Sequence, residues 1–174
     1  MKTIAISTLT VLFALSGTTA YAQSAAPNDA QIAGIVVAAN TVDIDAGKLA
    51  EGRADNKEVK QFAQQMVTDH TGVNKQATAL VQKLKVTPED SATSKSLKDG
   101  GKANEDKLKS LKGKDFDKAY VDNEVSYHQA VIDALDKTLI PSAKNAELKD
   151  LLVKVRPAFI AHLEHAKQVQ SSLK

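Results

Sequence analysis

The chain has no cysteine and no tryptophan, and aromatic residues make up only 4% of its 174 positions. The absence of cysteine excludes disulfide bonds, thiolate chemistry and an anchor built on a lipid-modified cysteine. Few aromatic residues, together with abundant Ala, Leu, Val and Lys, are typical of a helical bundle. Helix packing must therefore hold the fold without covalent cross-links.

A large excess of charge of either sign is also missing. Lys and Arg number 23 against 21 Asp and Glu, and the two signs are interspersed along the chain. Such a surface gives no reason to expect nucleic acid or anionic lipid as a partner. We therefore expect no nucleic-acid partner, and the sequence leaves any other partner unknown.

The one long apolar run lies at the N-terminus and has the features of an export signal. Lys2 gives a short positive start, residues 4–15 are apolar, and the small residues around Ala22 provide a cleavage site. The run is shorter than the ~20 residues of a membrane span, which favours a cleaved signal over an anchor. We expect cleavage after Ala22, which leaves residues 23–174 as one periplasmic or secreted domain, without membrane insertion of the mature chain.

Apolar residues recur at helical spacing in four segments of the mature chain. These segments are residues 32–50, 59–84, 115–139 and 146–173. Two residue pairs with the spacing of a capping box precede the first two segments, Asn28 with Gln31 and Asp55 with Glu58. The pattern predicts an antiparallel bundle of four main helices.

The polar stretch from Glu89 to Lys114 links the second and third of these helices. It holds few apolar residues, and Gly100-Gly101 lies inside it. We expect short, weakly amphipathic helices on the bundle surface, with a hinge or turn at the two glycines. The predicted fold class is therefore all-α, a four-helix bundle with an additional short helical crossover between the second and third main helices.

Three histidines fall on or beside the apolar stripes of three different predicted helices: His70, His128 and His162. An unsatisfied buried imidazole is costly, so each ring needs a hydrogen-bond partner, a charge or a metal. With a rise of ~1.5 Å per residue, these rings and Asp43 of the first stripe all lie near mid-height of the bundle. Glu124 lies one turn before His128 on nearly the same face. The five residues form a candidate polar layer in the core.

Two neighbours of the histidines are expected to lie outside this layer. Asp69 points about 100° away from His70 around the helix. His165 lies about 60° from His162 and would join the layer only if its helix were rotated slightly.

Two interpretations of the layer remain open. In the first, it is structural, and the histidines pair with carboxylates, tyrosines or backbone and fix the helix register. In the second, the three imidazoles with Asp43 or Glu124 bind one transition-metal ion such as zinc, copper or iron. Because polar core groups are usually paired within the protein, we favour the first interpretation and expect no cofactor, with the metal site as the alternative.

The sequence lacks the residue patterns of di-metal sites and of common enzyme active sites. Ferritin-like di-metal sites need a carboxylate three residues before a histidine, whereas Val67, Val125 and Phe159 occupy those positions. The sequence also has no Gly-rich phosphate loop, no Gly-x-Ser-x-Gly elbow and no His-Glu-x-x-His motif. We therefore expect a protein that is not an enzyme.

Four stretches carry a resemblance to a known family. They are residues 43–50 (DIDAGKLA), 62–70 (FAQQMVTDH), 116–128 (FDKAYVDNEVSYH) and 157–166 (PAFIAHLEHA). In this order and spacing they resemble the exported DUF4142 domain family, over nearly the whole mature chain. The resemblance implies an exported, all-α, ferritin-like helical bundle without an assigned reaction. At the position of Asp43 the family more often carries glutamate, a difference that keeps the acid.

Overall fold

Helices make up most of residues 26–173, the part of the chain that the computed structural model describes. They are α1 (Asp29–Arg53), α2 (Lys57–Leu84), α3 (Ala92–Ser110), α4 (Gly113–Ala134), α5 (Ile140–Ser142) and α6 (Ala146–Ser172). A π-helical turn, Leu135–Leu139, joins α4 to α5. No strand occurs between residues 26 and 173. The expected signal peptide, residues 1–22, lies outside the described residues.

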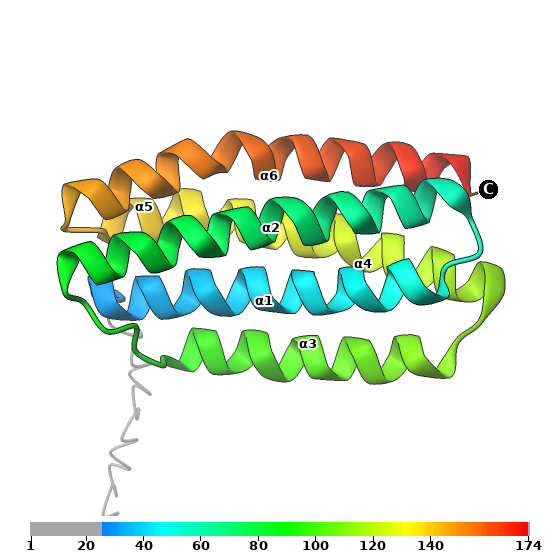
Figure 1. Ribbon diagram of the computed structural model, residues 1–174, viewed down its shortest axis with the longest axis horizontal. Coiled ribbons are helices and arrows are strands. Elements are labelled where there is room, and N and C mark those ends of the chain that lie inside the picture. The colour runs from blue at the N-terminus through cyan, green and yellow to red at the C-terminus, as the bar shows by residue number, and fades with distance from the viewer. Residues whose placement is uncertain (1–25, 174) are drawn as a thin grey trace, which may run out of the picture.

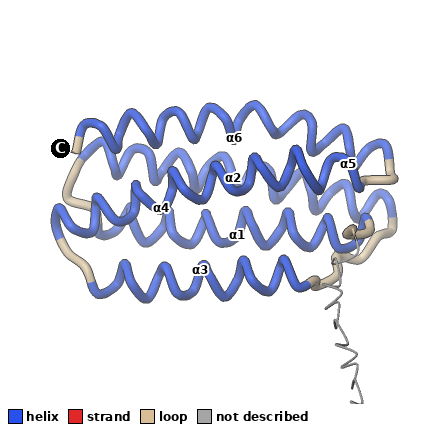
Figure 2. The backbone as a smooth tube through the Cα atoms, turned by 180° about the vertical axis from the view of Figure 1, so that it is seen from behind, coloured by secondary structure: helices blue, strands red, loops and turns tan. Residues whose placement is uncertain are grey.

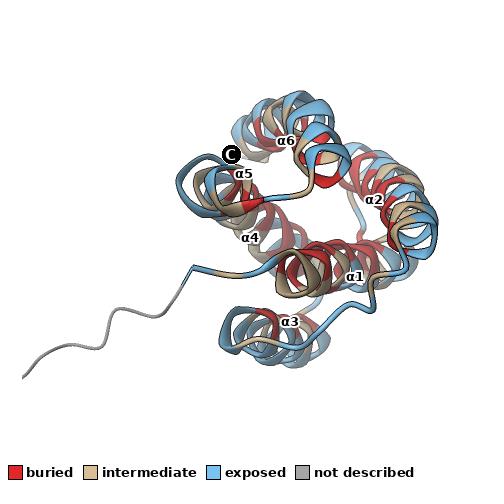
Figure 3. Cartoon of the chain, turned by 90° about the vertical axis from the view of Figure 1, so that its left-hand side faces the viewer, coloured by how far each residue is buried: buried red, intermediate tan, exposed pale blue. Residues whose placement is uncertain are grey.

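The helices α1, α2, α4 and α6 form a four-helix bundle (Figure 1). Viewed along the long axis, these four surround a common interior, and α3 lies on the outer side of α1 (Figure 3). Because α3 carries the chain back along the bundle, α2 and α4 run in the same direction. Among the helices of residues 26–173, none combines the length and apolar character needed to cross a bilayer. The predicted all-α bundle with a helical crossover is confirmed, while its assignment to ferritin-like bundles stays a prediction.

The crossover is one continuous helix rather than several short ones (Figure 2). Ser91 and Ser94 form a capping box at its start. The expected hinge at Gly100-Gly101 is wrong, because both residues lie inside α3. Gly101 is buried, and a Cβ there would lie 2.7 Å from Val42 Cγ2 on α1. The absence of a side chain at Gly101 therefore serves close helix packing.

The predicted cap of α1 is confirmed and that of α2 is wrong by one residue. Asn28 and Gln31 form the expected capping box. At α2 the cap is Asn56, whose side chain accepts hydrogen bonds from the backbone N–H of Glu58 and Val59. The backbone N–H groups of Asp55 and Asn56 in turn donate to the Asp117 carboxylate on α4. This buried carboxylate fixes the turn between α1 and α2 against α4.

The apolar core consists of two clusters at opposite ends of the bundle. One includes Ile32, Val73, Ile132, Leu152 and Phe159. The other includes Ala50, Phe62, Met66, Phe116 and Val169. On each bundle helix a buried polar residue stands between members of the two clusters, so a polar layer separates them. Leu80 on α2 and Val131 on α4 pack against the first cluster but are only partly buried.

Candidate metal centre

Each of the four bundle helices contributes at least one polar side chain to the middle of the core. These are Asp43 from α1, His70 from α2, Glu124 and His128 from α4, and His162 from α6, all at most 3% exposed. The centroids of the three imidazole rings lie 5.2 Å, 5.4 Å and 5.6 Å apart. The structure thus brings together all five residues that the sequence places in the layer.

A buried amide fixes the orientation of the His70 ring. His70 Nδ1 lies 2.7 Å from Asn40 Oδ1. The Asn40 amide nitrogen donates to the backbone oxygen of Val36 at 2.7 Å, which leaves the amide oxygen to face the imidazole. Since that oxygen only accepts, the proton of a neutral His70 ring lies on Nδ1 and the lone pair on Nε2.

The other two rings are oriented in the same way. His128 Nδ1 donates to the backbone oxygen of Glu124 at 3.0 Å. His162 Nε2 donates to Asp69 Oδ2 at 3.0 Å. Both acceptors are oxygens, so the lone pairs of the neutral rings lie on His128 Nε2 and His162 Nδ1.

The inward-facing atoms of the layer are unpaired. Among residues 26–173, the nitrogens His70 Nε2, His128 Nε2 and His162 Nδ1 and both oxygens of Asp43 have no hydrogen-bond partner. Asp43 Oδ2 lies 3.1 Å from His70 Nε2 and 3.5 Å from His128 Nε2, and neither ring nitrogen donates a hydrogen bond to it. Leaving a buried polar group unpaired costs about 1–3 kcal/mol, so these five atoms, together with Glu124 Oε2, need an explanation.

Burial makes the layer electrically neutral. It lowers the pKa of His70 to about 2 and that of His128 to about 4, and neighbouring imidazoles lower both further. It also lowers the pKa of His162, against the opposing effect of Asp69. Burial raises the pKa of Asp43 to about 8. At neutral pH the rings are therefore uncharged, which is the form that binds metal ions.

Glu124 lies beside the Nδ1 atom of the His128 ring. Its Oε2 atom is 3.5 Å from His128 Nδ1, the nitrogen that faces away from the unpaired side. Burial, and then the neighbouring Asp43, raise the pKa of Glu124 well above its ordinary value. Two sets of residues offer ligand atoms within 4.8 Å of one another, the three histidines and the group of Asp43, Glu124 and His128. The outer nitrogen of His128 is occupied, so the three histidines with Asp43 are the more compatible set.

Two residues of the site lie outside the sequence prediction. Asp69 lies outside the buried layer, as expected, but the sequence did not predict that its carboxylate extends from α2 to the His162 ring on α6. Asn40 was not predicted at all, although its position three residues before Asp43 on the same stripe was a signal. His165 lies outside the layer, where it contacts Gln65 at 3.0 Å.

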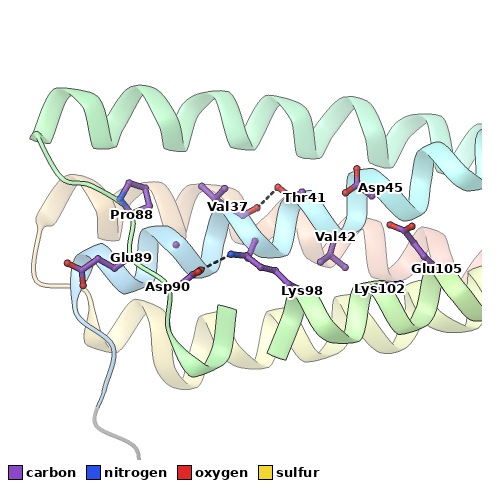
Figure 4. A pocket seen from close by; sticks show the side chains of 13 residues that line it. Val37, Thr41, Val42, Asp45, Pro88, Glu89, Asp90, Lys98, Lys102 and Glu105 are labelled. Carbon is purple, nitrogen blue, oxygen red and sulfur yellow. Dashed lines mark hydrogen bonds and ion pairs between the residues drawn. The ribbon is translucent and has the colours of Figure 1, made fainter. Parts of the chain in front are cut away.

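The pockets described on the chain are lined by other residues. A surface groove of about 560 Å³ lies between α1 and α3, where Lys98 pairs with Asp90 at 2.7 Å (Figure 4). A smaller apolar cavity of about 130 Å³ adjoins the layer at Asn40, Tyr127 and Phe159. Neither includes a residue of the polar layer itself.

Comparisons with known proteins agree with the fold. The structure is similar to that described as "CopM in the Cu(II)-bound form", with a TM-score of 0.64, 17% sequence identity, and coverage of 84% of this chain and 98% of that one. At this identity the likeness shows a shared helical fold. No curated protein sequence is significantly similar. The model of the family described as "Domain of unknown function (DUF4142)" matches residues 14–169, so the chain belongs to the DUF4142 family.

Proposed function

We propose that this protein is a non-enzymatic binding protein for one transition-metal ion, held in the bundle core by His70, His128 and His162 with Asp43 as the fourth ligand. One observation carries the proposal. Each imidazole donates its outer N–H to an oxygen and leaves its inner nitrogen unpaired at the bundle centre. Histidines that bind metals have this arrangement, because the outer hydrogen bond fixes the tautomer and the ring orientation.

The dimensions of the layer suit a tetrahedral site. Imidazole nitrogens bound at ~2.0–2.1 Å with tetrahedral angles place the ring centres about 5 Å apart. The observed separations of 5.2–5.6 Å are close to this value. Asp43 Oδ2 faces the inner nitrogens of two of the rings. A bound ion would satisfy the inner nitrogens and an oxygen of Asp43 at once.

The donor set favours copper or zinc. Imidazole with a carboxylate, and without a thiolate, suits Zn²⁺ and Cu²⁺, with iron as the third choice. CopM, which shares the fold at 17% identity, was determined with Cu(II) bound. This supports Cu²⁺ as the first ion to test.

The structural interpretation of the layer is the competing proposal. In it the histidines pair with carboxylates, tyrosines or backbone, which the outer nitrogens of His128 and His162 do, but it leaves the inner nitrogens without a partner. An enzyme would need a pocket that admits substrate to the reacting groups, and the groove and cavity described above are lined by other residues. These observations favour binding over catalysis.

We also propose that the protein is exported and acts in the periplasm or outside the cell. The support is the N-terminal pattern of Lys2, an apolar run and a cleavage site at Ala22. Determining the N-terminal residue of protein recovered from the periplasmic fraction tests this proposal. A mature chain that begins at Met1 and stays inside the cell would contradict it.

Metal analysis together with thermal unfolding tests the metal site. Protein purified from the exported fraction should contain about one ion per chain, and Cu²⁺ or Zn²⁺ should raise the melting temperature of the metal-free protein. The variant His128→Ala should lose this increase. If copper, zinc and iron all fail to stabilise the wild-type protein at concentrations far above a plausible dissociation constant, the proposal is wrong.

A further inference from the structure

The outer hydrogen-bond partners of the three histidines differ in their access to solvent. Asn40 is 2% exposed, and the Glu124 oxygen that binds His128 belongs to the backbone of a buried residue. The Asp69 side chain, in contrast, is 41% exposed, while the His162 ring that it contacts is 4% exposed. Of the three outer partners, Asp69 alone joins the layer to solvent.

Polar contacts continue from Asp69 along the junction of α2 and α6, which lie next to each other in the bundle (Figures 1 and 3). Gln65 donates from its amide to Asp69 Oδ2 at 3.3 Å. His165 contacts Gln65 Oε1 at 3.0 Å, and its ring packs edge-on against Phe62. We call Gln65, Asp69, His162 and His165 the α2–α6 polar seam. It leads from solvent to the unpaired Nδ1 atom of His162.

The side of the layer between α1 and α4 is lined mainly by apolar side chains instead. Tyr127 on α4 donates its hydroxyl to the backbone oxygen of Ala39 on α1 at 2.9 Å. His70 and Asn40 are both buried where α1 meets α2. The polar groups named on these sides, and the Thr41–Asn74 pair between α1 and α2, are neutral, so a cation that entered there would lose its water without gaining a carboxylate.

We propose that the metal ion enters and leaves the core through the α2–α6 polar seam, with Asp69 as the residue that captures it and His162 as the ligand that passes it inward. This inference rests on the proposed metal-binding function. The two nitrogens of His162 face opposite ways, one toward Asp69 and one toward the layer. A rotation of this ring lets the ion exchange water for the Asp69 carboxylate, then for imidazole, before it reaches His70 and His128. The carboxylate also attracts the cation from solution.

The variant Asp69→Asn separates this role from a purely orienting one. Its amide oxygen still accepts a hydrogen bond from His162 Nε2, while the negative charge at the mouth of the seam is lost. We expect association of Cu²⁺ to slow by about tenfold at low ionic strength, with one ion still bound per chain at saturation. The matched control is Asp45→Asn, which removes the same charge from the side of α1 that faces α3. It should associate with Cu²⁺ at the wild-type rate.

Stopped-flow tyrosine fluorescence measures these rates on the purified protein with CuCl₂. The chain has no tryptophan, and the Tyr127 ring lies 6.2 Å from the His128 ring, so bound Cu²⁺ should quench tyrosine emission. Equal association rates for Asp69→Asn and Asp45→Asn would overturn the access route and leave the metal site intact. Unchanged association with faster dissociation would limit Asp69 to orienting His162 and would also overturn the route. A wild-type protein that binds no metal would refute the proposed function and the route together.

Discussion

Replacing His128 with leucine distinguishes a metal site from a structural layer. The ring is fully buried, Nε2 is unpaired, and Nδ1 donates to the Glu124 backbone oxygen. Removing the unpaired nitrogen recovers about 1–3 kcal/mol, and losing the hydrogen bond costs about 1 kcal/mol. We therefore expect metal-free His128→Leu to be up to about 2 kcal/mol more stable than the wild type. For a chain of this size, the melting temperature should rise by up to roughly 8 °C.

The same substitution should abolish stabilisation by metal. An ion present at a hundredfold excess over its dissociation constant stabilises the wild-type protein by about 2.7 kcal/mol, and His128→Leu should show no such gain. Thermal unfolding with and without Cu²⁺ measures both effects. The control is Tyr127→Phe on the same helix, which removes the hydrogen bond to Ala39 and about 1 kcal/mol of stability. This control should keep the response to metal.

The opposite result would refute the reasoning. If metal-free His128→Leu is less stable than the wild type by about 2 kcal/mol or more, the ring makes interactions that the layer needs. If the wild type also shows no shift with Cu²⁺, Zn²⁺ or Fe²⁺, the layer is structural. Unfolding in urea provides a second measurement, because it gives the free energy of unfolding without heating the protein to temperatures at which it could aggregate irreversibly.

Three further substitutions test other parts of the structure by urea unfolding of the metal-free protein. Burial raises the pKa of native Asp43 from 3.8 to about 8, so the folded protein keeps a proton that the unfolded chain releases. As the pH rises between these values, the free energy of unfolding should therefore fall by up to about 1.4 kcal/mol per pH unit. Asp43→Asn lacks this loss, so its stability relative to the wild type should increase with pH. Gly101→Ala should cost about 1–3 kcal/mol, because its Cβ meets Val42. Its control Gly100→Ala has no atom within 4 Å and should gain up to about 1 kcal/mol of helix propensity. Asp117→Ala should cost about 3 kcal/mol, because two backbone N–H groups lose a buried carboxylate partner.

Each of these expectations has a result that contradicts it. Parallel pH profiles for Asp43→Asn and the wild type would mean that Asp43 is ionised in the native core. Equal stabilities of the two glycine variants would mean that α3 does not pack tightly on α1. A stable Asp117→Ala protein would mean that solvent replaces the carboxylate at the turn between α1 and α2.

The sequence predicts the bundle well because apolar periodicity records which face of each helix is buried. The four long stripes correspond to α1, α2, α4 and α6. The crossover is less predictable, since α3 buries only Ser94, Gly101 and Leu108. A paired glycine in a polar segment indicates a turn from local preferences alone. This prediction fails because α1 lies close to α3, where a glycine at the contact allows the two backbones to pack together.

The membership of the layer is predictable, whereas its hydrogen bonds are not. Helix rise and the apolar stripes suffice to place Asp43, His70, His128 and His162 at one height. Which nitrogen of each ring faces inward depends on how neighbouring helices are rotated against one another, and a single sequence does not contain that angle. The contact of Asp69 with His162 is the clearest example of such an unpredicted hydrogen bond, because the two residues lie 93 positions apart in the sequence and on different helices.

The two apolar clusters explain how a core with unpaired polar atoms keeps its shape. Each bundle helix is anchored on both sides of the layer, by residues such as Val73 and Met66 on α2 and Leu152 and Val169 on α6. The inner nitrogens therefore stay close together even though nothing among residues 26–173 pairs with them. Burial favours the neutral rings, so the three imidazoles do not repel one another at neutral pH. Under the proposed function, an ion that entered this layer would find its ligands already arranged, and the strength of binding would depend mainly on releasing the Asp43 proton and on the outer hydrogen bonds.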